Sequence, residues 1–367
     1  MAEIKERMKK NGKKTYTACI RIKGHKPMYA TFDRKTDAQI WVQEYEPKIK
    51  RGKKITEYEA TKHTLNELID RYIEIELPKR KETDQKKYKM QLQWWKNHIG
   101  MYLLSNVTPA LLSECKEKLT TEQSAKPKGN NKTRSGATAN RYMACLSIVL
   151  SIACKEWGWI EENPMLKVRK YTECANKDRF LNQEEIKQVL QGCMNFDLKG
   201  DNYNKETYLF VLIALSTGAR YSEIHKLTWD NVDFKNRQFY FLQTKNGENR
   251  GVPMSETVYQ ELKAFKKVRN IKNNYLWTTK DGRKLIDMRV RFYKVLEVSG
   301  VKCRFHDLRH TVASHIAMNG GSLLDIAQIT GHKTMQMVKR YSHLTQKHTA
   351  KLLQETTDEM FSEIREL

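Results

Sequence analysis

The stretch FHDLRHTVASHI (residues 305–316) places two histidines and an arginine within five residues. His306 and Arg309 are three residues apart, so both side chains leave one face of a helix, and His310 lies close to that face. Histidine and arginine are uncommon in protein cores, and arginine is the rarer of the two. A metal site is disfavoured, because no second carboxylate or cysteine cluster lies nearby in the sequence and arginine would repel a cation. The pattern therefore indicates an anion site, and a phosphate fits it best.

A second arginine lies upstream, in STGARYSEI (216–224), at the end of a strongly apolar helix that is predicted over residues 208–220. An arginine at such a place is costly to desolvate unless it meets an anion. Glu223, three residues after Arg220, can share its helical face and orient it. A purely structural Arg–Glu pair is the alternative, and this motif taken alone favours that alternative.

Downstream, the stretch TGHKTMQMVKRYSH (330–343) adds a histidine and a tyrosine. Gly331 and His332 precede a short predicted helix, and Tyr341 follows nine residues after the histidine. A lone tyrosine is most often a packing or surface residue. Tyr341 is a candidate functional residue because it completes an ordered series of polar residues.

A β-hairpin is predicted over RQFYFLQTKNGENRGVPMS (237–255), because Asn246-Gly247 is a strong signal for a two-residue turn between strands. Lys245 stands beside this turn. A lysine on such a turn is usually solvated. It would belong to a site only if the hairpin folds over a substrate.

In chain order, the arginine, the lysine, the HxxR pair, the GH pair and the tyrosine between residues 220 and 341 resemble the tyrosine recombinase (phage integrase) family. STGARYSEI resembles the family's first arginine box, HDLRHTVASH its second, and ITGHKTMQMVKRYSH its final histidine and nucleophile box. The resemblance is strong over residues 180–345. Thr330 stands where the family usually has Leu, and the last box reads YSH instead of YTH. Neither departure removes a catalytic group, so only local packing is in doubt.

The resemblance implies that this site cleaves DNA. Arg220 and Arg309 would hold the two non-bridging oxygens of the scissile phosphate, since their planar forks suit this better than lysine would. Tyr341 would attack in line and form a 3′-phosphotyrosyl link, while Lys245 would protonate the leaving 5′ oxygen. The covalent link conserves the energy of the phosphodiester, so no cofactor, ATP or metal ion is implied.

The same resemblance gives the remaining polar residues their roles. His306 would assist proton movement at the nucleophile, and His332 would hydrogen-bond a phosphate oxygen. Glu223 and His310 would support these groups. A free tyrosine has a pKa near 10, so cationic surroundings that favour the phenolate would assist the attack.

The composition independently points to a polyanionic partner. Lysine and arginine number 67 against 43 acidic residues, which gives a formal net charge of +24. Solubility alone is the alternative explanation. No apolar run approaches the roughly 20 residues that span a bilayer, and the N-terminus lacks an apolar signal region. The seven scattered cysteines form no CxxC pair, which favours reduced thiols. The composition therefore favours a nucleic acid, DNA or RNA, over a membrane, and the cysteines favour a cytoplasm. The resemblance implies double-stranded DNA as the partner, in a bacterial cell and at the nucleoid.

We expect a mainly α, multidomain (α+β) chain with three domains. Residues 1–58 predict strands at 15–24 and 28–33, followed by a helix with Thr36 as its N-cap. This basic unit loosely resembles the small sheet domain that integrases use to bind DNA arm sites. A passive basic appendage is the alternative.

Residues 62–170 predict a helical unit that resembles the family's core-site DNA-binding domain. Thr108 and Pro109 mark one helix start, while the polar stretch 120–136 is expected to be a flexible loop. Four aromatic residues are expected mainly to pack a core: Trp94, Trp95, Trp157 and Trp159. The charged stretch 168–179 is expected to be a linker to the catalytic domain, residues 175–367.

A final helix in AKLLQETTDEMFSEIREL (350–367) would carry one apolar face, made of Met360, Phe361, Ile364 and Leu367. The resemblance implies that this helix packs onto a neighbouring copy in a homotetramer on DNA, with DNA-bending proteins as further partners. Packing onto its own domain is the alternative, because an apolar stripe does not identify its partner.

The sequence therefore predicts a site-specific DNA recombinase that integrates or excises a mobile element. A type IB-like topoisomerase, which uses nearly the same site as a monomer, is the alternative enzyme. A non-catalytic DNA-binding regulator is the alternative without catalysis. It is disfavoured because no member of the series from Arg220 to Tyr341 is missing.

Overall fold

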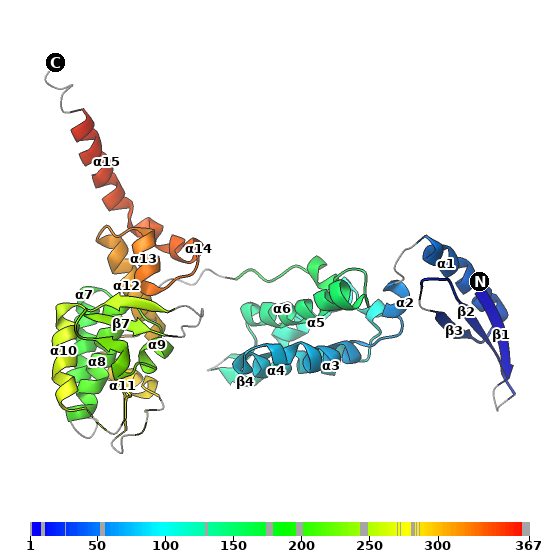
Figure 1. Cartoon of the computed structure of the whole chain (residues 1–367), viewed down its shortest axis with the longest axis horizontal. Coiled ribbons are helices and arrows are strands. Elements are labelled where there is room, and N and C mark those ends of the chain that lie inside the picture. Colours follow the sequence, from blue (N-terminus) through cyan, green and yellow to red (C-terminus); the bar gives the residue numbers. More distant parts are fainter. Residues whose placement is uncertain are drawn as a thin grey trace. The chain divides into compact units, whose positions relative to one another are not determined.

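The structure is a computed structural model that describes residues 2–8, 12–25, 27–51, 56–128, 131–173, 179–195, 201–242, 249–269, 271, 273–279, 283, 285 and 287–361. The chain forms two compact units, Met1–Ala175 and Asn176–Leu367 (Figure 1). Helices dominate both units and the sheets are small and antiparallel, so the expected mainly α fold is confirmed. The boundary between the units falls inside the predicted linker 168–179. The finer division into three domains stays a prediction.

The N-terminal sheet has three antiparallel strands, in the order β1 (Ala2–Met8), β2 (Lys14–Ile20) and β3 (Met28–Phe32). Helix α1 (Lys35–Lys50) lies against this sheet (Figure 1). Ala18 and Ile20 of β2 are buried together with Trp41 of α1, because alternate residues of a strand face one side of its sheet.

One element in this region was missed and one prediction was wrong. β1 was not predicted, because charged residues dominate its sequence. It is an edge strand with mostly exposed side chains, held by backbone pairing with β2 from Ala2↔Ile20 to Met8↔Lys14. The N-cap of α1 is Arg34 rather than Thr36, and no side chain caps this helix.

The rest of the first unit is helical, with α2 (Thr56–Ala60), α3 (Leu65–Ile75), α4 (Glu82–Ile99), α5 (Pro109–Thr121) and α6 (Gly136–Ile152), which continues as a π-helix over Ala153–Trp157. Thr108 caps α5 as predicted, since its hydroxyl accepts from the Leu111 N–H at 3.3 Å. Trp94 and Trp95 are buried in the core, and Trp157 and Trp159 pack around the Arg71 guanidinium.

The stretch predicted as a flexible loop, 120–136, is a short hairpin instead. Strand β4 (Gln123–Lys128) pairs antiparallel with β5 (Asn131–Thr133). Its polar composition hid the strands, because a hairpin held by backbone hydrogen bonds does not need an apolar face. The linker is also partly ordered: Tyr171 exchanges two hydrogen bonds with Asn140, each 2.9 Å long.

One helical stretch, Gly136–Trp157, is long and apolar enough to cross a membrane by length and composition alone. Half of its apolar window is buried inside the protein, as in the core helix of a globular unit. Leu146, Val149 and Leu150 are fully buried in the helical core.

The second unit contains the helices α7 (Gln183–Asn195), α8 (Asp201–Thr217), α9 (Tyr221–His225), α10 (Glu256–Lys267), α11 (Arg289–Ser299), α12 (Phe305–Met318), α13 (Leu323–Thr330), α14 (Met335–Val338) and α15 (Gln346–Met360). Helix α8 is the apolar helix predicted near residues 208–220, but it ends at Thr217. Asn182 caps α7 as predicted, accepting from the Glu185 N–H at 2.8 Å. Phe210 of α8 packs against Trp277 and Phe305 in the core.

A small antiparallel sheet completes this unit, in the order β6 (Val232–Asp233), β7 (Gln238–Phe241) and β8 (Arg250–Pro253). The predicted hairpin is confirmed, because β7 and β8 pair from Gln238↔Pro253 to Phe241↔Arg250. Its predicted turn, Asn246-Gly247, lies outside the described residues.

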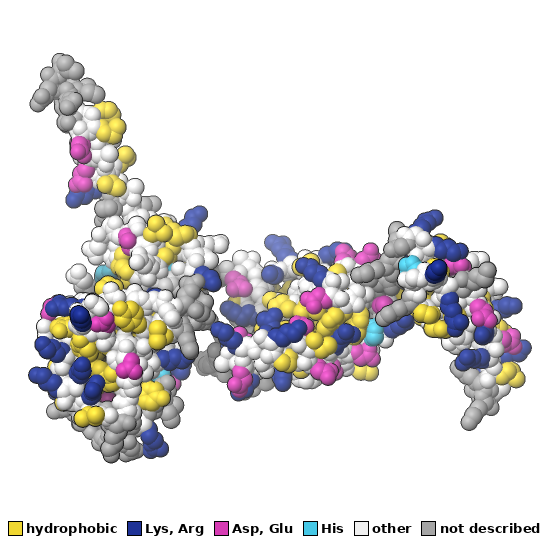
Figure 2. Space-filling view, viewed as in Figure 1, with side chains coloured by type: hydrophobic (Ala, Val, Ile, Leu, Met, Phe, Trp, Pro, Cys, Tyr) yellow, Lys and Arg dark blue, Asp and Glu magenta, His cyan; other side chains and the backbone are white. Residues whose placement is uncertain are grey.

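Helix α15 forms most of the predicted tail helix, and its described apolar residues are exposed. Leu352 and Leu353 are 53% and 65% exposed, and Met360 and Phe361 are 67% and 48% exposed. Figure 2 shows hydrophobic and acidic side chains along different sides of this helix. Two residues of the predicted apolar face, Ile364 and Leu367, lie outside the described residues.

Candidate active site

The second unit brings together five of the six predicted catalytic residues from three distant parts of the sequence. They are Arg220, His306, Arg309, His332 and Tyr341. The sixth, Lys245, lies outside the described residues.

Arg220 is positioned by the end of one helix and the start of the next. Helix α8 stops before Gly218, and Arg220 is the N-cap of α9. Its backbone N–H donates to Oε2 of Glu223 at 3.0 Å, and its Nη1 donates to Oε1 at 2.7 Å. Nη2 donates to the carbonyl of Gly331 at 3.1 Å. The carboxylate therefore orients the arginine, as the sequence suggested.

Arg309, on α12, is only 3% exposed. Its Nη1 donates to the Gly218 carbonyl at 2.8 Å and to the Thr330 carbonyl. Its Nη2 is buried and has no hydrogen-bond partner among the described residues. Burial, followed by the charges of Arg220 and Arg250, lowers the pKa of the guanidinium to about 9. Arg309 thus remains charged at neutral pH, with one donor nitrogen available to an anion.

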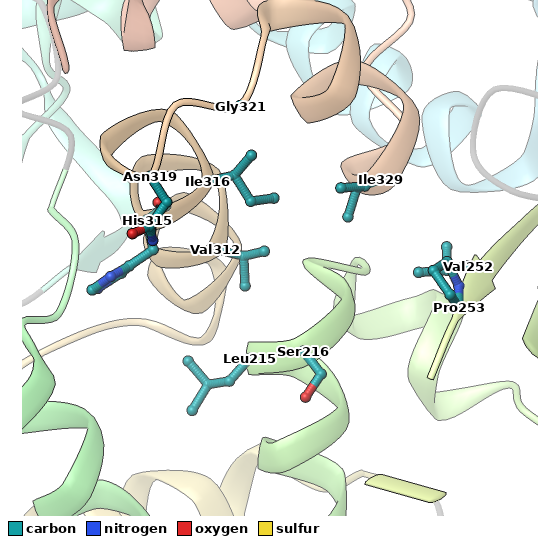
Figure 3. Close-up of a pocket in the computed structure, with 10 residues that line it drawn as sticks. All are labelled: Leu215, Ser216, Val252, Pro253, Val312, His315, Ile316, Asn319, Gly321 and Ile329. Atoms are coloured by element: carbon teal, nitrogen blue, oxygen red, sulfur yellow. Dashed lines mark hydrogen bonds between the residues drawn. The ribbon is translucent and has the colours of Figure 1, made fainter. Parts of the chain in front are cut away.

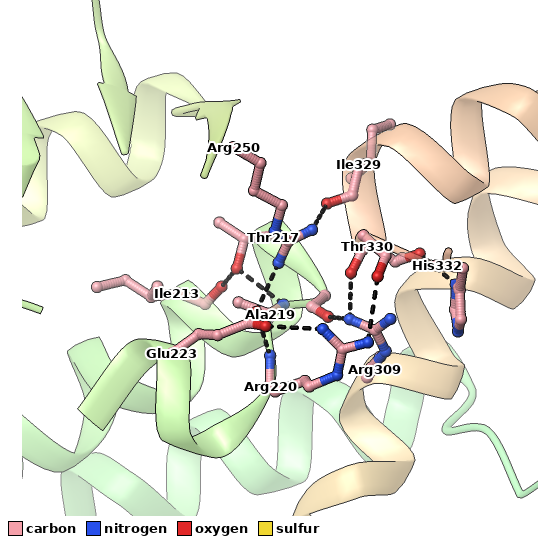
Figure 4. A network of polar contacts seen from close by, with 12 residues as sticks. Ile213, Thr217, Ala219, Arg220, Glu223, Arg250, Arg309, Ile329, Thr330 and His332 are labelled. Carbon is pink, nitrogen blue, oxygen red and sulfur yellow. Dashed lines mark hydrogen bonds and ion pairs between the residues drawn. The ribbon is translucent and has the colours of Figure 1, made fainter. Parts of the chain in front are cut away.

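A third arginine, Arg250, joins the first two (Figure 4). It begins β8 and donates from Nη2 to Oε2 of Glu223 at 2.8 Å and from Nη1 to the Ile329 carbonyl. Burial lowers the pKa of its guanidinium. Burial alone would raise the pKa of Glu223, but the charges of Arg250 and Arg220 outweigh burial and lower it. We call Arg220, Arg250, Arg309 and Glu223 the cationic cluster, since it combines three guanidiniums with one carboxylate, which pairs with Arg220 and Arg250.

Two glycines allow the segments of this cluster to approach closely. Gly218 has φ of +58°, and a Cβ there would lie 2.9 Å from Cγ2 of Thr330. Gly331 has φ of +71°, and a Cβ there would lie 2.9 Å from Nη1 of Arg250. Both positions combine a left-handed backbone with a tight contact, so they require glycine.

The candidate nucleophile, Tyr341, lies in a 3₁₀ turn (Lys339–Leu344) and is only 1% exposed. Its ring packs in a small apolar cluster with Ala313, Ile326 and Val338. Its hydroxyl lies 2.6 Å from Nδ1 of His310. Because His310 follows Arg309 on α12, the phenol is held beside the cationic cluster.

The structure assigns the contact with the phenol to a different histidine than we expected. The sequence placed His306 at the nucleophile and His310 in support. In the structure His310 contacts Tyr341, while the His306 ring packs edge-on against His310, with 5.0 Å between centroids. The helical periodicity explains this, because His310 lies one turn further along α12 and points inward.

The two other histidines are held in their neutral forms. His306 is exposed, but partial desolvation, followed by His310 and Arg309, lowers its pKa to about 4. His332 follows α13, and burial, Arg309 and Arg220 lower its pKa to about 3. Its ring centroid lies 6.4 Å from that of Tyr341.

Sequence reasoning missed Arg250 and the contacts of Thr330. One feature of the sequence could have indicated Arg250. It lies two residues before the buried Val252 in β8, so both side chains point to the inner face of that strand. Thr330 was expected to affect local packing only. In the structure its hydroxyl lies 2.5 Å from Nδ1 of His332, and its carbonyl accepts from Arg309.

A pocket of about 470 Å³ lies next to the cationic cluster (Figure 3). Residues from α8, β8, α12, α13 and the segment between α12 and α13 line it: Leu215, Ser216, Val252, Pro253, Val312, His315, Ile316, Asn319, Gly321 and Ile329. The lining is mostly apolar. This pocket was not predicted from the sequence.

Comparison with known proteins agrees with this geometry. Residues 179–348 match the phage integrase family. An integrase of Haemophilus phage HP1 (strain HP1c1) is 33% identical over 216 residues, which cover 58% of this chain and 57% of that protein. A shufflon-specific DNA recombinase of Escherichia coli is 31% identical over 214 residues, covering 57% of this chain and 51% of that protein. The chain thus spans about half the length of these curated relatives.

Solved structures share the fold at lower identity. The Tn1549 transposon integrase, in complex with circular intermediate DNA, has a TM-score of 0.64 at 19% identity, covering 78% of this chain and 99% of that one. A lambda integrase dimer bound to a COC′ core site has a TM-score of 0.61 at 18% identity, covering 92% and 93%. The arginine, histidine and tyrosine boxes lie within the region that the family match covers. Residues 179–348, which are slightly under half of the chain, therefore match the phage integrase family, and over this region the chain resembles its members.

Proposed function

We propose that this protein is a site-specific DNA recombinase that breaks and rejoins DNA strands through a 3′-phosphotyrosyl intermediate on Tyr341. The observation that carries the proposal is the excess of buried positive charge beside a buried phenol. Arg309 is 3% exposed and its Nη2 has no hydrogen-bond partner among the described residues. Burying a charge without a partner is costly, so this arrangement favours an anion that arrives with the substrate.

The scissile phosphate is the anion that this site would take. Arg220 and Arg309 present two planar donors, which match the two non-bridging oxygens of a phosphodiester. Their backbone and carboxylate contacts fix both guanidiniums before DNA arrives. Donors that are already oriented stabilise the charge that develops in the pentavalent transition state with little reorganisation.

In the cleavage step, the Tyr341 oxygen forms a bond to phosphorus and the bond from phosphorus to the 5′ oxygen breaks. The phenol proton passes to the histidine pair His306–His310, whose second member lies 2.6 Å from the phenol. Lys245 supplies a proton to the leaving 5′ oxygen. In the second step, the 5′-hydroxyl of another strand attacks the phosphotyrosine, the strands are joined, and Tyr341 leaves with its proton restored.

DNA would also be bound away from the active site. The formal net charge of +24 supports binding to a duplex. We assign residues 62–170 to the core site and residues 1–58 to distant arm sites. A chain that lacks residues 1–58 should bind core DNA normally but integrate poorly. Equal integration by the truncated chain would contradict the arm-binding role.

Assembly would use the tail. The described apolar residues of α15 are exposed within their own unit, including Leu353 at 65% and Met360 at 67%. We assign this face to a neighbouring copy in a homotetramer on DNA. DNA-bending proteins are proposed as accessory partners in the same complex.

The test of the proposed function begins with DNA junctions recovered from cells and sequenced, which define the substrate. A nicked duplex with that sequence should give a protein–DNA adduct that survives denaturing electrophoresis. Tyr341→Phe should abolish the adduct and leave DNA binding nearly intact. Unchanged cleavage by this variant would contradict the assignment, and relaxation of plasmids without strand exchange would favour a topoisomerase.

A further inference from the structure

Thr330 ends α13 and is fully buried, with 0% exposure. Its hydroxyl makes two contacts. One is to the backbone carbonyl of Ile326, one helical turn earlier, and the other is to Nδ1 of His332 at 2.5 Å. The side chain therefore joins the end of a helix to a candidate catalytic histidine.

The chemistry of these groups fixes the direction of both hydrogen bonds. A carbonyl oxygen can only accept, and a threonine hydroxyl carries one hydrogen. Thr330 must therefore donate to Ile326 and use a lone pair to accept from His332. It follows that Nδ1 of His332 carries a proton. In a neutral imidazole the other nitrogen, Nε2, is then an acceptor.

Arginines and one further titratable histidine face His332 from the elements packed near it. Arg309 and His310 face it from α12, Arg220 from the start of α9, and Arg340 from the same turn as Tyr341. Arg250 of β8 approaches the adjacent Gly331. In the absence of an anion, this environment disfavours a second proton on the ring. Its burial acts in the same direction, and together they lower the pKa of His332 to about 3.

We propose that Thr330 is a positioning residue that fixes His332 as the neutral tautomer protonated at Nδ1, so that His332 can donate to a phosphate oxygen only after Nε2 takes up a proton. The phosphate as ligand rests on the function proposed above, whereas the tautomer rests on the hydrogen bonds alone. On binding, the phosphate charge offsets Arg220 and Arg309, a proton from solvent adds to Nε2, and the new N–H donates to the phosphate oxygen. DNA binding at this site is thus coupled to uptake of one proton.

The first test determines the tautomer of His332 and does not depend on a measurement of activity. Full-length protein labelled with ¹⁵N-histidine is examined by NMR at pH 7, and His332→Gln assigns the signal of His332. We expect a protonated Nδ1 and an unprotonated Nε2. Thr330→Val keeps the side-chain shape but removes the hydroxyl, so it should lose this signature, whereas Thr330→Ser should keep it. A wild-type signal with the proton on Nε2 would overturn the proposal.

The second test measures the coupling between DNA binding and proton uptake by His332. The rate of adduct formation on the nicked duplex, at DNA concentrations below saturation, is measured from pH 6 to pH 8. In Thr330→Val the His332 ring no longer needs a proton on Nδ1. Its single proton can lie on Nε2, so the ring can donate to the phosphate oxygen without taking up a proton. The ratio of the Thr330→Val rate to the wild-type rate should therefore rise with pH, by up to about tenfold per unit.

The Thr330→Ser variant should follow the wild type, and equal melting temperatures exclude a folding defect. Parallel pH profiles for wild type and Thr330→Val would contradict the coupling. If the wild type forms no adduct at all, the proposed function fails, and the NMR measurement still decides the tautomer.

Discussion

Two buried arginine sites in the second unit differ in their balance of charge. Arg291 of α11 pairs with Glu206 of α8 at 2.8 Å, and the two side chains are 11% and 12% exposed. In the cationic cluster, Arg220 and Arg250 both pair with the carboxylate of Glu223. Arg309 donates to backbone carbonyls instead, and its Nη2 has no partner among the described residues. A buried arginine with a matched acid is explained by structure alone. An unmatched excess of buried arginine indicates a ligand of opposite charge.

The carboxylates of the two sites respond in opposite ways. Burial raises the pKa of Glu206, and the single Arg291 does not fully offset that effect. Glu223 is also buried, but Arg250 and Arg220 together lower its pKa. The surroundings of Glu223 therefore favour its charged form, whereas those of Glu206 disfavour it.

The largest effect should separate the two sites by activity. Arg309→Lys keeps the charge but loses the planar fork, so we expect adduct formation to slow by about 100- to 1000-fold. Arg291→Lys is the matched control, and its rate should stay within about twofold of wild type at a temperature where it is folded. Single-turnover assays on the nicked duplex measure both rates. A similar loss in the two variants would erase the functional distinction between the sites.

The next effect should separate them by stability. Arg291→Met leaves Glu206 buried without its partner, so the free energy of unfolding should fall by about 3 kcal/mol. Replacing both residues, with Glu206→Leu and Arg291→Met, should restore most of that loss, because no buried charge remains. Urea unfolding followed by tryptophan fluorescence measures these values. A loss below about 1 kcal/mol in the single variant would show that the pair is not the structural site we describe.

A smaller effect should appear in the pH dependence of stability. The pKa of His332 is about 3 in the folded protein and near 6.5 in the unfolded chain, so the folded state binds fewer protons between these values. Its stabilising contribution is present above pH 6.5 and is lost as the pH falls. Between pH 6.5 and pH 5, wild type should lose up to about 1.6 kcal/mol more stability than His332→Gln, the upper value applying if solvent does not screen the ring. Identical acid-side slopes in urea unfolding would contradict a neutral His332.

The smallest effect should come from a simple anion. Inorganic phosphate at about ten times its dissociation constant should stabilise wild type by about 1.4 kcal/mol, through binding to the cationic cluster. Arg309→Lys should reduce this gain, while Arg291→Lys should keep it. Thermal unfolding with matched chloride controls for ionic strength. Equal stabilisation of both variants would place the anion elsewhere.

The sequence predicted the parts of the site that act through local spacing. The pairing of Arg220 with Glu223 was predicted from their three-residue separation, and in the structure it joins the N-cap of α9 to the third residue of that helix. The helix starts at Thr108 and Asn182 were predicted correctly, because each capping side chain bonds a backbone N–H only three residues later. These features depend on residues that are neighbours in the sequence.

The features that the sequence did not predict depend on distant neighbours. Arg250 forms an ion pair with Glu223, which lies 27 residues earlier in the sequence, and the sequence of its strand does not indicate this partner. Strand β1 is stabilised by pairing with β2 rather than by its own side chains. From the sequence, Thr330 was interpreted as affecting local packing only. Its hydrogen bond to His332 could not be predicted, because that bond forms only where the chain turns at Gly331.

The measurement that tests the central claim most directly is the chemical identity of the covalent adduct. The protein is trapped on the nicked duplex, digested with trypsin and nuclease, and analysed by mass spectrometry. We predict a nucleotide joined through its 3′ phosphate to the phenol oxygen of Tyr341, with a free hydroxyl on the 5′ end of the cut strand. An adduct on another residue, or a linkage through a 5′ phosphate, would contradict the account.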